Sequence, residues 1–324
     1  MTTHAFLYSA EAPDRPLDLA GIRPGELTSS QLLWVDIEDP SDDDIRGVAE
    51  VLGIAGELLG LETGDRTRPT LSNFGDRFRL TATSVSVDDT RSALLRHNLT
   101  LLAGRNVVVS VHAEKLPFID ELRSREKGDS DIGALSAESF VASLLDWLLG
   151  GYFSAVETLI RDVDRVEVAI LRNRLPPRFL EALVQARKRI AELRRLLKSH
   201  RDVFHGLARP DFVATERPED KPHFEALMRH YERAEDELES ARDLVIGSFE
   251  LLSTRAAEST NDTMHKLTFA TVLMGVLALV AGVMGMNFQA PFFDAGLAGF
   301  LVVIGSMVAL SVLAVWVGIR RSWI

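Results

Sequence analysis

The 324-residue chain has no cysteine and no excess of basic residues, and both absences exclude classes of function. Without thiols there are no disulfides, and any metal site must use carboxylate, imidazole, amide, carbonyl or water ligands. The 47 acidic residues outnumber the 36 lysines and arginines, which gives a formal net charge of −11. Nucleic acids are bound by neutralising phosphates with basic side chains, so we expect no nucleic-acid partner. An acidic surface suits the collection of cations, although it also simply favours solubility.

Charged side chains are missing from two long runs, Leu267–Phe293 and Ala295–Ile319. Each run is longer than the roughly 20 apolar residues with which a helix crosses a bilayer. We therefore predict a hairpin of two transmembrane helices that follows a large body. Its expected parts are a first span over residues 267–288, an outer loop over 289–296, a second span over 297–319 and a basic tail over 320–324.

The basic residues around the hairpin predict its orientation. Lys266 precedes the first span, and Arg320 and Arg321 follow the second, whereas the loop carries only Asp294. The positive-inside rule then places both termini in the cytoplasm. Residues 1–20 lack the basic start and apolar core of a signal peptide, so we expect the body to stay cytoplasmic. The protein is expected to be a multi-pass protein of a bacterial-type inner membrane, in contact with membrane lipids.

Short apolar or alternating runs in residues 1–130 predict an α/β domain, with antiparallel hairpins and a few helices. Ser41 is expected to cap a helix that starts at Asp42, where the helix dipole favours acidic residues. The nearby carboxylates could instead form an ion site, but we prefer capping and a solvated surface. These carboxylates are Asp36, Glu38, Asp39, Asp42, Asp43 and Asp44. The predicted strands are His4–Tyr8, Leu32–Ile37, Phe78–Val87, Ala93–Leu102 and Asn106–Val111.

Apolar residues at helical spacing in residues 131–266 predict a region of long stalk helices. The first helix covers residues 136 to about 174, with Gly150-Gly151 as a weak point. The second covers Pro177 to about Ala208. The third starts at Lys221-Pro222, and no further proline occurs before Pro291, so one helix of roughly 100 Å can continue into the first span. A helix of this length indicates a stalk in an assembly.

Small and polar residues form one stripe along the first span, at three- and four-residue spacing. One interpretation is close packing of membrane helices. The other is the wall of a pore, in which narrow side chains leave room and oxygen atoms offer ligands to an ion or its water shell. Two spans are too few to enclose a pathway, so a pore requires a ring of subunits. The stripe consists of Thr268, Thr271, Gly275, Ala278 and Gly282, and Asn261 and Met264 extend it before the span.

The tripeptide Gly285-Met286-Asn287 ends the first span and favours the pore interpretation. In a symmetric ring it would lie in the pore mouth, where Asn287 would supply a ring of amide oxygens. Amide oxygens suit hard divalent cations and can hold an ion through its first-shell water. Mg²⁺ sheds water reluctantly, so selection through the water shell is physically reasonable.

With this motif, an α/β body, long helices, two late apolar spans and a closing basic-Ser-Trp-Ile tail, the whole sequence resembles the CorA superfamily of divalent-cation transporters. The resemblance implies an α+β cytoplasmic domain, long stalk helices and two C-terminal transmembrane helices, assembled as a homopentameric funnel. It implies that Gly285, Met286 and Asn287 form the selectivity motif of a central pore. The implied pore-lining residues are Asn261, Met264, Thr271, Gly275 and Gly282, with Leu267 as a hydrophobic gate and Glu250 as a weakly matched metal ligand deeper in the stalk.

Within the superfamily, the soluble part resembles the ZntB branch, which is associated with zinc uptake. Three segments carry this resemblance: Arg66-Thr67-Arg68-Pro69, Leu175-Pro176-Pro177-Arg178 and Arg201-Asp202-Val203-Phe204. Gly-Met-Asn, by contrast, is the form of the motif in the magnesium branch, and the outer loop lacks the Met-Pro-Glu-Leu segment common there. The transported ion is therefore expected to be Zn²⁺ or Mg²⁺, with Co²⁺ and Ni²⁺ as further candidates.

The histidines of the long helices do not form the i, i+4 pair of a tight zinc site. We interpret His200, His205, His223 and His230 as surface or packing residues. His265, just before the first span, has the same interpretation, but its titration near neutral pH would also suit proton-linked transport.

We therefore predict a homopentamer that conducts divalent cations. It is expected to have no enzymatic activity and no covalently bound cofactor, because no nucleophile–base set or phosphate-binding glycine loop is present. Two alternatives stay open. A membrane-anchored sensor or scaffold could bind metal without conducting it, with the stripe serving only for packing. An exporter of the same architecture is equally compatible, because a pore has no direction apart from its driving force and gate.

Overall fold

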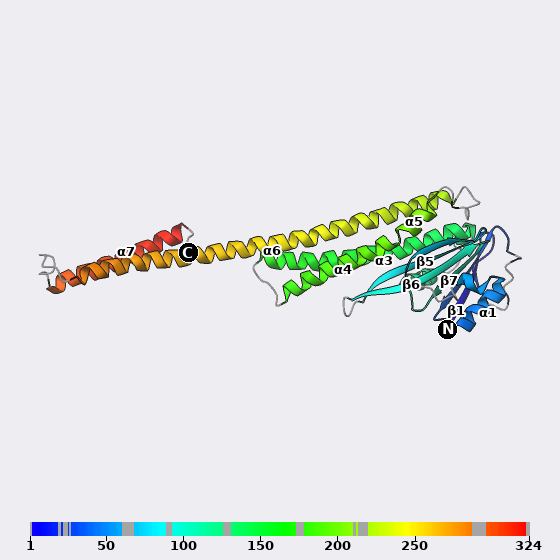
Figure 1. The fold of residues 1–324 in the computed structure, drawn as a ribbon, viewed down its shortest axis with the longest axis horizontal. Helices are drawn as coiled ribbons and strands as arrows, with labels where there is room; N and C mark the ends of the chain where they lie inside the picture. The colour runs from blue at the N-terminus through cyan, green and yellow to red at the C-terminus, as the bar shows by residue number, and fades with distance from the viewer. Residues whose placement is uncertain are drawn as a thin grey trace. The chain divides into compact units, whose positions relative to one another are not determined.

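The computed structural model describes residues 2–18, 21, 25, 27–59, 68–88, 93–125, 131–172, 178–209, 212, 220–286 and 296–321. The chain divides into two compact units, Met1–Gly247 and Ser248–Ile324. The first unit contains a sheet with helices packed on it, and the second contains two long apolar helices (Figure 1).

A seven-stranded sheet with the order β2-β1-β3-β7-β6-β5-β4 forms the centre of the first unit. All neighbouring strands are antiparallel except β3 and β7, which are parallel. Arg105 and Asn106 join β6 to β7 with φ angles of 51° and 60°, as in a tight two-residue hairpin. The predicted hairpins and strands are confirmed, whereas β2 and β4 are too short to stand out in the sequence. The strands are β1 (Thr2–Ser9), β2 (Arg15–Leu17), β3 (Gln31–Glu38), β4 (Thr70–Asn73), β5 (Phe78–Asp88), β6 (Ala93–Gly104) and β7 (Val107–His112).

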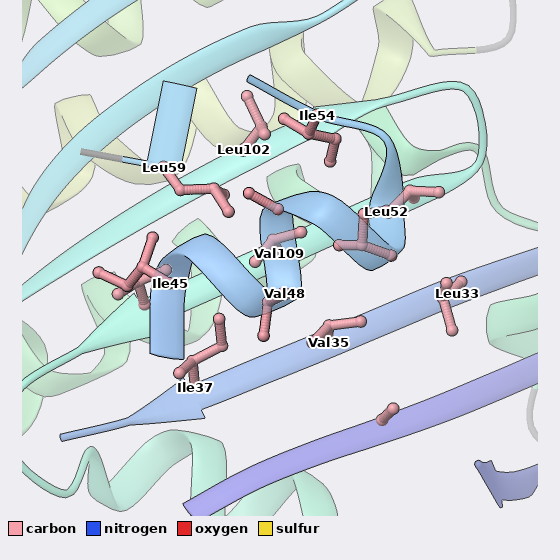
Figure 2. Packing of buried hydrophobic residues seen from close by; sticks show 14 residues of the cluster. Leu33, Val35, Ile37, Ile45, Val48, Leu52, Ile54, Leu59, Leu102 and Val109 are labelled. Carbon is pink, nitrogen blue, oxygen red and sulfur yellow. The ribbon is translucent and has the colours of Figure 1, made fainter. Parts of the chain in front are cut away.

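One face of the sheet is covered by α1 (Asp42–Leu52) and the 3₁₀ turn η3 (Gly56–Leu59). Their apolar side chains pack on alternate residues of β3 and on β6 and β7 (Figure 2). A capping box starts α1: Ser41 Oγ accepts a hydrogen bond from the Asp44 amide, and the Asp44 carboxylate accepts one from the Ser41 amide. The hydrogen bonds from Ser41 lower the pKa of Asp44. The predicted cap is therefore confirmed.

The opposite face of the sheet carries α3 (Ala137–Leu171), which is the first of the predicted long helices. The ring of Phe140 contacts those of Trp34 and Tyr8, with centroid distances of 5.5 and 5.9 Å. A Cβ atom at Gly151 would lie 2.4 Å from the carbonyl oxygen of Val85. This glycine lets α3 approach β5 closely, and α3 continues without a break through Gly150-Gly151, the predicted weak point.

The second predicted long helix is two helices in the structure, α4 (Phe179–Ser199) and α5 (Arg201–Leu207), which meet at His200. His200 is fully buried. Its Nδ1–H donates to the Leu196 carbonyl oxygen at 2.8 Å, and its Nε2 accepts from the Thr83 amide of β5 at 2.8 Å. The pairing of β4 with β5 ends at Thr81, so His200 satisfies a strand amide beyond that end. The break is a tertiary effect, which is why no proline or glycine marks it.

Acidification is expected to destabilise the first unit through His200. Burial lowers the pKa of His200 to about 4 from the ordinary 6.5, against the opposing effect of the Leu196 hydrogen bond. The neutral ring stabilises the fold above pH 6.5, and this contribution is lost as the pH falls through 4, because a protonated Nε2 cannot accept from Thr83. We expect a loss of about 3 kcal/mol, visible as a lower melting temperature at pH 4 than at pH 7. His200→Gln should flatten this profile, and an unchanged profile would contradict the assignment.

The remaining helices include the longest in the chain. In the sequence, α2 (Pro117–Arg125) and the 3₁₀ turn η4 (Asp131–Ala134) follow β7 and precede α3. α6 (Lys221–Met284) is one unbroken helix, as the absence of proline predicts, and its residues belong to both units. In the first unit, Tyr231 of α6 stacks on Phe204 of α5 with a centroid distance of 4.6 Å. α7 (Gly296–Arg320) belongs to the second unit.

Candidate ion pathway

The helices of the second unit are apolar but uncovered. No residue from 253 to 286 is buried, and Gly318 is the only buried residue among those described in α7. Among the described residues, three helices are long and apolar enough to cross a membrane: α3, α6 and α7. The apolar window of α3 is 61% buried, whereas those of α6 and α7 are 0% buried. Packing on the sheet explains the apolar character of α3, so α6 and α7 are the helices left to contact lipid.

α7 covers one side of α6. Between residues 267 and 284, the half-buried positions of α6 recur every three or four residues, which corresponds to one face of a helix. The two helices also share an open, mostly apolar groove of about 420 Å³, lined by Ala281 and Met284 of α6 and by Gly285 directly after it. The half-buried residues of α6 are Phe269, Leu273, Leu277, Val280 and Met284.

The predicted small and polar stripe lies on the other side of α6. At about 100° per residue, its centre is roughly 180° around the helix from the half-buried face. Every stripe residue is exposed in the single chain. Met264 lies on the same face, and Asn261 and Leu267 lie at its two edges. The structure thus brings together Thr268, Thr271, Gly275, Ala278 and Gly282 on a face of α6 that α7 does not cover.

Hydroxyl oxygens provide polar character along this helix. Thr271 donates its hydroxyl hydrogen to the Leu267 carbonyl oxygen at 2.8 Å, so the lone pairs of its oxygen can accept a hydrogen bond. Thr260 and Thr263 donate in the same way to carbonyls one turn earlier. Such oxygens can accept hydrogen bonds from the water shell of an ion.

Gly285 and Met286, the first two residues of the predicted motif, form the turn that ends α6. Their amides donate to the Ala281 and Val283 carbonyl oxygens at 2.9 and 3.2 Å. Met286 is half exposed. Asn287 and the predicted outer loop up to residue 295 lie outside the described residues, so the third residue of the motif is known from the sequence alone.

Glu250, the weakly matched metal ligand, is exposed on α6. It precedes Asn261 by eleven residues, which is close to three helical turns, so both lie on the same face. Across the described part of the chain, no group of three or more His, Cys, Asp or Glu is placed to hold a metal ion.

The first unit contains a buried charged cluster that the sequence did not predict. Asp36 was expected at a solvated surface, but it is 1% exposed. It accepts hydrogen bonds from Ser110 Oγ and, at 3.1 Å, from His112 Nε2, while Arg123 lies 3.4 Å from its other oxygen. Trp34 Nε1 donates to Ser110 at 2.9 Å. Both faces of β3 are buried, and the continuous apolar run Leu32–Val35 is typical of such a strand, but the run does not show which residues surround Asp36.

The cluster favours the charged form of His112. Burial by itself lowers the pKa of His112, but the hydrogen bond to Asp36 and the charge of Asp36 raise it above its ordinary value. The Glu114 carbonyl, which accepts from His112 Nδ1 at 2.6 Å, and the charge of Glu38 act in the same direction. Asp36 therefore lies between Arg123 and His112, and it favours the protonated form of the histidine.

The histidines of the long helices are packing or surface residues, as predicted. His200 is buried, whereas His205 and His265 are exposed. His223 and His230 of α6 contact Ser139 and Asp146 of α3.

An α/β body, a helix shared by both units and two exposed apolar helices together define a membrane protein with a soluble part. The stripe of small and polar residues on α6 is typical of membrane helices that pack closely or line a pathway. The sequence matches the family described as CorA-like Mg2+ transporter protein over residues 29–321, and the chain belongs to this family. It is 24% identical over 298 residues to the cobalt/magnesium transport protein CorA of Thermotoga maritima, across 91% of this chain and 84% of that protein.

Solved structures share the fold. The complete CorA magnesium transporter of Methanocaldococcus jannaschii superposes with a TM-score of 0.74 at 19% identity, over 100% of this chain and 99% of that one. The ZntB cytoplasmic domain of Vibrio parahaemolyticus superposes with a TM-score of 0.58 at 16% identity, over 80% of this chain and 100% of that domain. The predicted fold class of soluble α+β domain, long helices and two C-terminal apolar helices is confirmed. Family membership makes the chain a divalent-cation transporter of the membrane, and not an enzyme.

Proposed function

We propose that this protein conducts divalent cations through a central pore formed by α6 of five identical chains, with the stripe as the wall of the pore. The observation that carries this proposal is that the stripe lies on the face of α6 turned away from α7 and is exposed along its length. Threonines and glycines aligned on an apolar membrane helix are expected where copies of the helix meet around a pathway.

The number of copies comes from the resemblance to the CorA superfamily, which implies a homopentamer. Two membrane helices per chain are too few to enclose a pathway, whereas a ring of α6 helices can do so. The polar residues of α6 between Ser253 and Lys266 are exposed in the single chain, and in such a ring they would meet the same residues of neighbouring copies. Membrane lipids would contact α7 and the large apolar residues of α6.

Selectivity is assigned to a ring of Asn287 side chains at the end of the pore. Amide oxygens can bind the first-shell water of a divalent cation, so the ion need not lose that shell. Gly285 leaves the backbone at the start of the motif free of a side chain, and Leu267 would narrow the other end of the stripe. Glu250 extends the same face further along α6 and is the proposed carboxylate of the pathway.

The proposed cargo is Mg²⁺ or Zn²⁺, with Co²⁺ and Ni²⁺ as further candidates. The Gly-Met-Asn motif and the name of the Thermotoga maritima relative, a cobalt/magnesium transport protein, support magnesium and cobalt. The shared fold of the ZntB cytoplasmic domain accompanies the sequence segments that resemble the ZntB branch, and these support zinc.

We place the protein in the inner membrane with both termini in the cytoplasm, on the strength of Lys266, Arg320 and Arg321. For a doubly charged ion moving inward, a membrane potential contributes about 4.6 kcal/mol per 100 mV. Uptake then needs no other energy source.

Flux into liposomes tests the proposal. Purified protein is reconstituted, Mg²⁺ and Zn²⁺ are offered separately, and entry is measured with an imposed voltage or an imposed pH gradient. Asn287→Ala is expected to lower the flux, or the preference among cations, at least about tenfold, which corresponds to about 1.4 kcal/mol. Gln289→Ala removes an amide two residues later and serves as the matched control.

The alternatives give different results in the same experiment. A membrane-anchored sensor or scaffold would bind metal without flux and would tolerate Asn287→Ala. An exporter would move metal outward under physiological gradients in cells while the liposomes still showed a pore. Zinc entry that rises with the proton gradient would favour a ZntB-like transporter, whereas voltage-driven magnesium entry would favour the CorA type.

A further inference from the structure

Polar contacts join α3 to α6 at a constant separation in sequence. Within the first unit, the two helices lie side by side (Figure 1). Ser136 contacts Asp220, Ser139 contacts His223 and Asp146 contacts His230, and each pair is 84 residues apart. A constant separation means that the helices run parallel and in step over this stretch. We call these three pairs the polar seam.

At the N-terminal end of the polar seam, one carboxylate contacts the starts of both helices. Asp220 is 3% exposed, and its Oδ1 accepts hydrogen bonds from Ser136 Oγ and, at 2.6 Å, from Ser139 Oγ. Ser136 also caps α3 by accepting from the Ser139 amide at 2.9 Å. The backbone carbonyl of Asp220 accepts from the amides of His223 and Phe224 in the first turn of α6.

Ser139, His223 and Asp220 are not arranged as a nucleophilic site. Ser139 donates its hydroxyl hydrogen to Asp220, so it accepts from His223 Nδ1–H, which lies 2.6 Å away. The serine therefore lies between the histidine and the carboxylate, whereas an activated serine donates to a histidine that the carboxylate orients. The arrangement serves to hold the two helices together.

At the other end of the polar seam, the pair Asp146 and His230 is more exposed to solvent. The side chains of the hydrogen-bonded pair Asp146 and His230 are about half exposed, so their contact contributes little to stability. Its value is geometric, because it connects the helices nearly three turns of α6 beyond Asp220. Arg233 of α6 also lies over the ring of Phe153 of α3, at 5.7 Å from the ring centroid.

The apolar face of α6 does not fix its axial position by itself. Its buried residues repeat at three- and four-residue spacing, so displacement by one turn again brings apolar residues onto the apolar surface. Polar pairs at fixed positions remove this degeneracy, as buried polar residues do in coiled coils. The repeating residues are Phe224, Leu227, Tyr231, Ala234, Leu238, Ala241 and Val245.

We propose that the polar seam holds α6 at one axial register along α3, and that its members are positioning residues for transport. The proposal rests on the proposed function, in which α6 lines the pathway. α6 is unbroken to Met284, and a helix is stiff along its axis, so displacement of its first turns is passed to the stripe. One residue of slip corresponds to about 1.5 Å and one turn to about 5.4 Å.

Flux measurements with rescue test the transport role. Asp146→Ala and His230→Ala are each expected to change the maximal flux at least threefold, with little change in the metal concentration for half-maximal flux or in melting temperature. The exchanged pair Asp146→His with His230→Asp should restore the flux. Asp162→Ala removes an exposed carboxylate of α3 that pairs with Arg165 on the same helix, and this control should conduct normally.

Two results separate this proposal from the proposed function. Wild-type protein that carries no metal would overturn the proposed function. Normal flux in both single variants, or no rescue by the exchanged pair while each protein stays folded, would overturn the role of the polar seam alone.

Cross-linking tests the register itself, and the absence of cysteine makes it specific. In full-length protein in membranes, the pair Asp146→Cys with His230→Cys should react with a short bifunctional thiol reagent at least tenfold faster than the pair Asp146→Cys with Ala226→Cys. The second pair reports displacement by four residues. Adding Asp220→Ala to each cysteine pair should bring the ratio of the two cross-linking rates closer to one. Equal rates in the unaltered background, or a ratio insensitive to Asp220→Ala, would overturn the proposal.

Discussion

Leucine in place of Gly275 is expected to reduce metal flux at least about 100-fold while leaving the fold of each chain intact. Gly275 lies on the face of α6 opposite the residues that contact α7. Nothing lies within 4 Å of a Cβ atom built there, so the larger side chain fits the single chain. Leucine also favours helix more than glycine does, which removes unfolding of α6 as an explanation. In a ring of copies, however, five leucines would fill the narrow space that glycine leaves.

The matched control is Ala270→Leu. Ala270 is exposed on the same helix and within the same apolar run, but about 140° around the axis from Gly275. Both variants are reconstituted, and flux is measured together with the mass of the intact assembly. A blocked pore predicts loss of flux in Gly275→Leu, normal flux in Ala270→Leu and intact assemblies for both.

Two other outcomes would decide against the pore wall. Dissociation of the Gly275→Leu assembly would show that the stripe is a packing surface between helices. Wild-type flux with the assembly intact would show that the stripe faces neither the pathway nor a close neighbour. A graded series through Gly275→Ala and Gly275→Ser then relates flux to side-chain size.

Much of the fold follows from patterns that act along the chain. The uncharged runs predict the two apolar helices, and the lack of proline between Pro222 and Pro291 predicts the continuity of α6. Ser41 and Asp44 predict the start of α1, because a capping box needs only residues that are close in sequence. The spacing of small and polar residues by three and four likewise predicts which residues form the stripe on α6.

The remaining features depend on residues that are far apart in sequence. The helix break at His200 exists because a strand amide more than 100 residues earlier needs an acceptor. The cluster around Asp36 combines β3, β7 and α2, and the residues near Asp36 in the sequence do not show that side chains of β7 and α2 surround it. For the stripe, the sequence cannot decide which face α7 covers. The burial of Phe269, Leu273 and Leu277 decides this.

Polar groups therefore have different roles on α6 and in the first unit. On α6, the polar oxygens of the stripe are exposed in the single chain and suit a hydrated ion. In the first unit, charged and hydroxyl groups are buried in contact with one another: one carboxylate oxygen of Asp36 and one of Asp220 each accept hydrogen bonds from neighbouring side chains. Substitutions in the first set should alter flux with little effect on folding, and substitutions in the second should alter folding first.

The second large effect is expected from Asp36→Ala, which should destabilise the first unit by about 3–5 kcal/mol. The substitution leaves the buried His112 and the partly buried Arg123 without their shared anion, and it also removes an acceptor of Ser110. Asp43→Ala is the matched control, because the Asp43–Arg46 ion pair lies at the surface. Melting temperatures of the full-length proteins in detergent should separate the two variants by about 10 °C.

The pH dependence of the difference in stability between wild type and Asp36→Ala tests whether the loss of the contact with His112 causes the destabilisation. The pKa of His112 is raised in the folded protein, so its pairing with Asp36 contributes fully below about pH 6.5 and is lost as the pH rises through the raised value. The gap in stability between wild type and Asp36→Ala should therefore be widest at mildly acidic pH and should narrow in alkaline solution, where the pair Asp36–Arg123 alone remains. A gap that stays constant from pH 6 to pH 9 would show that His112 takes no part. A variant as stable as Asp43→Ala would show that the cluster does not hold β3, β7 and α2 together.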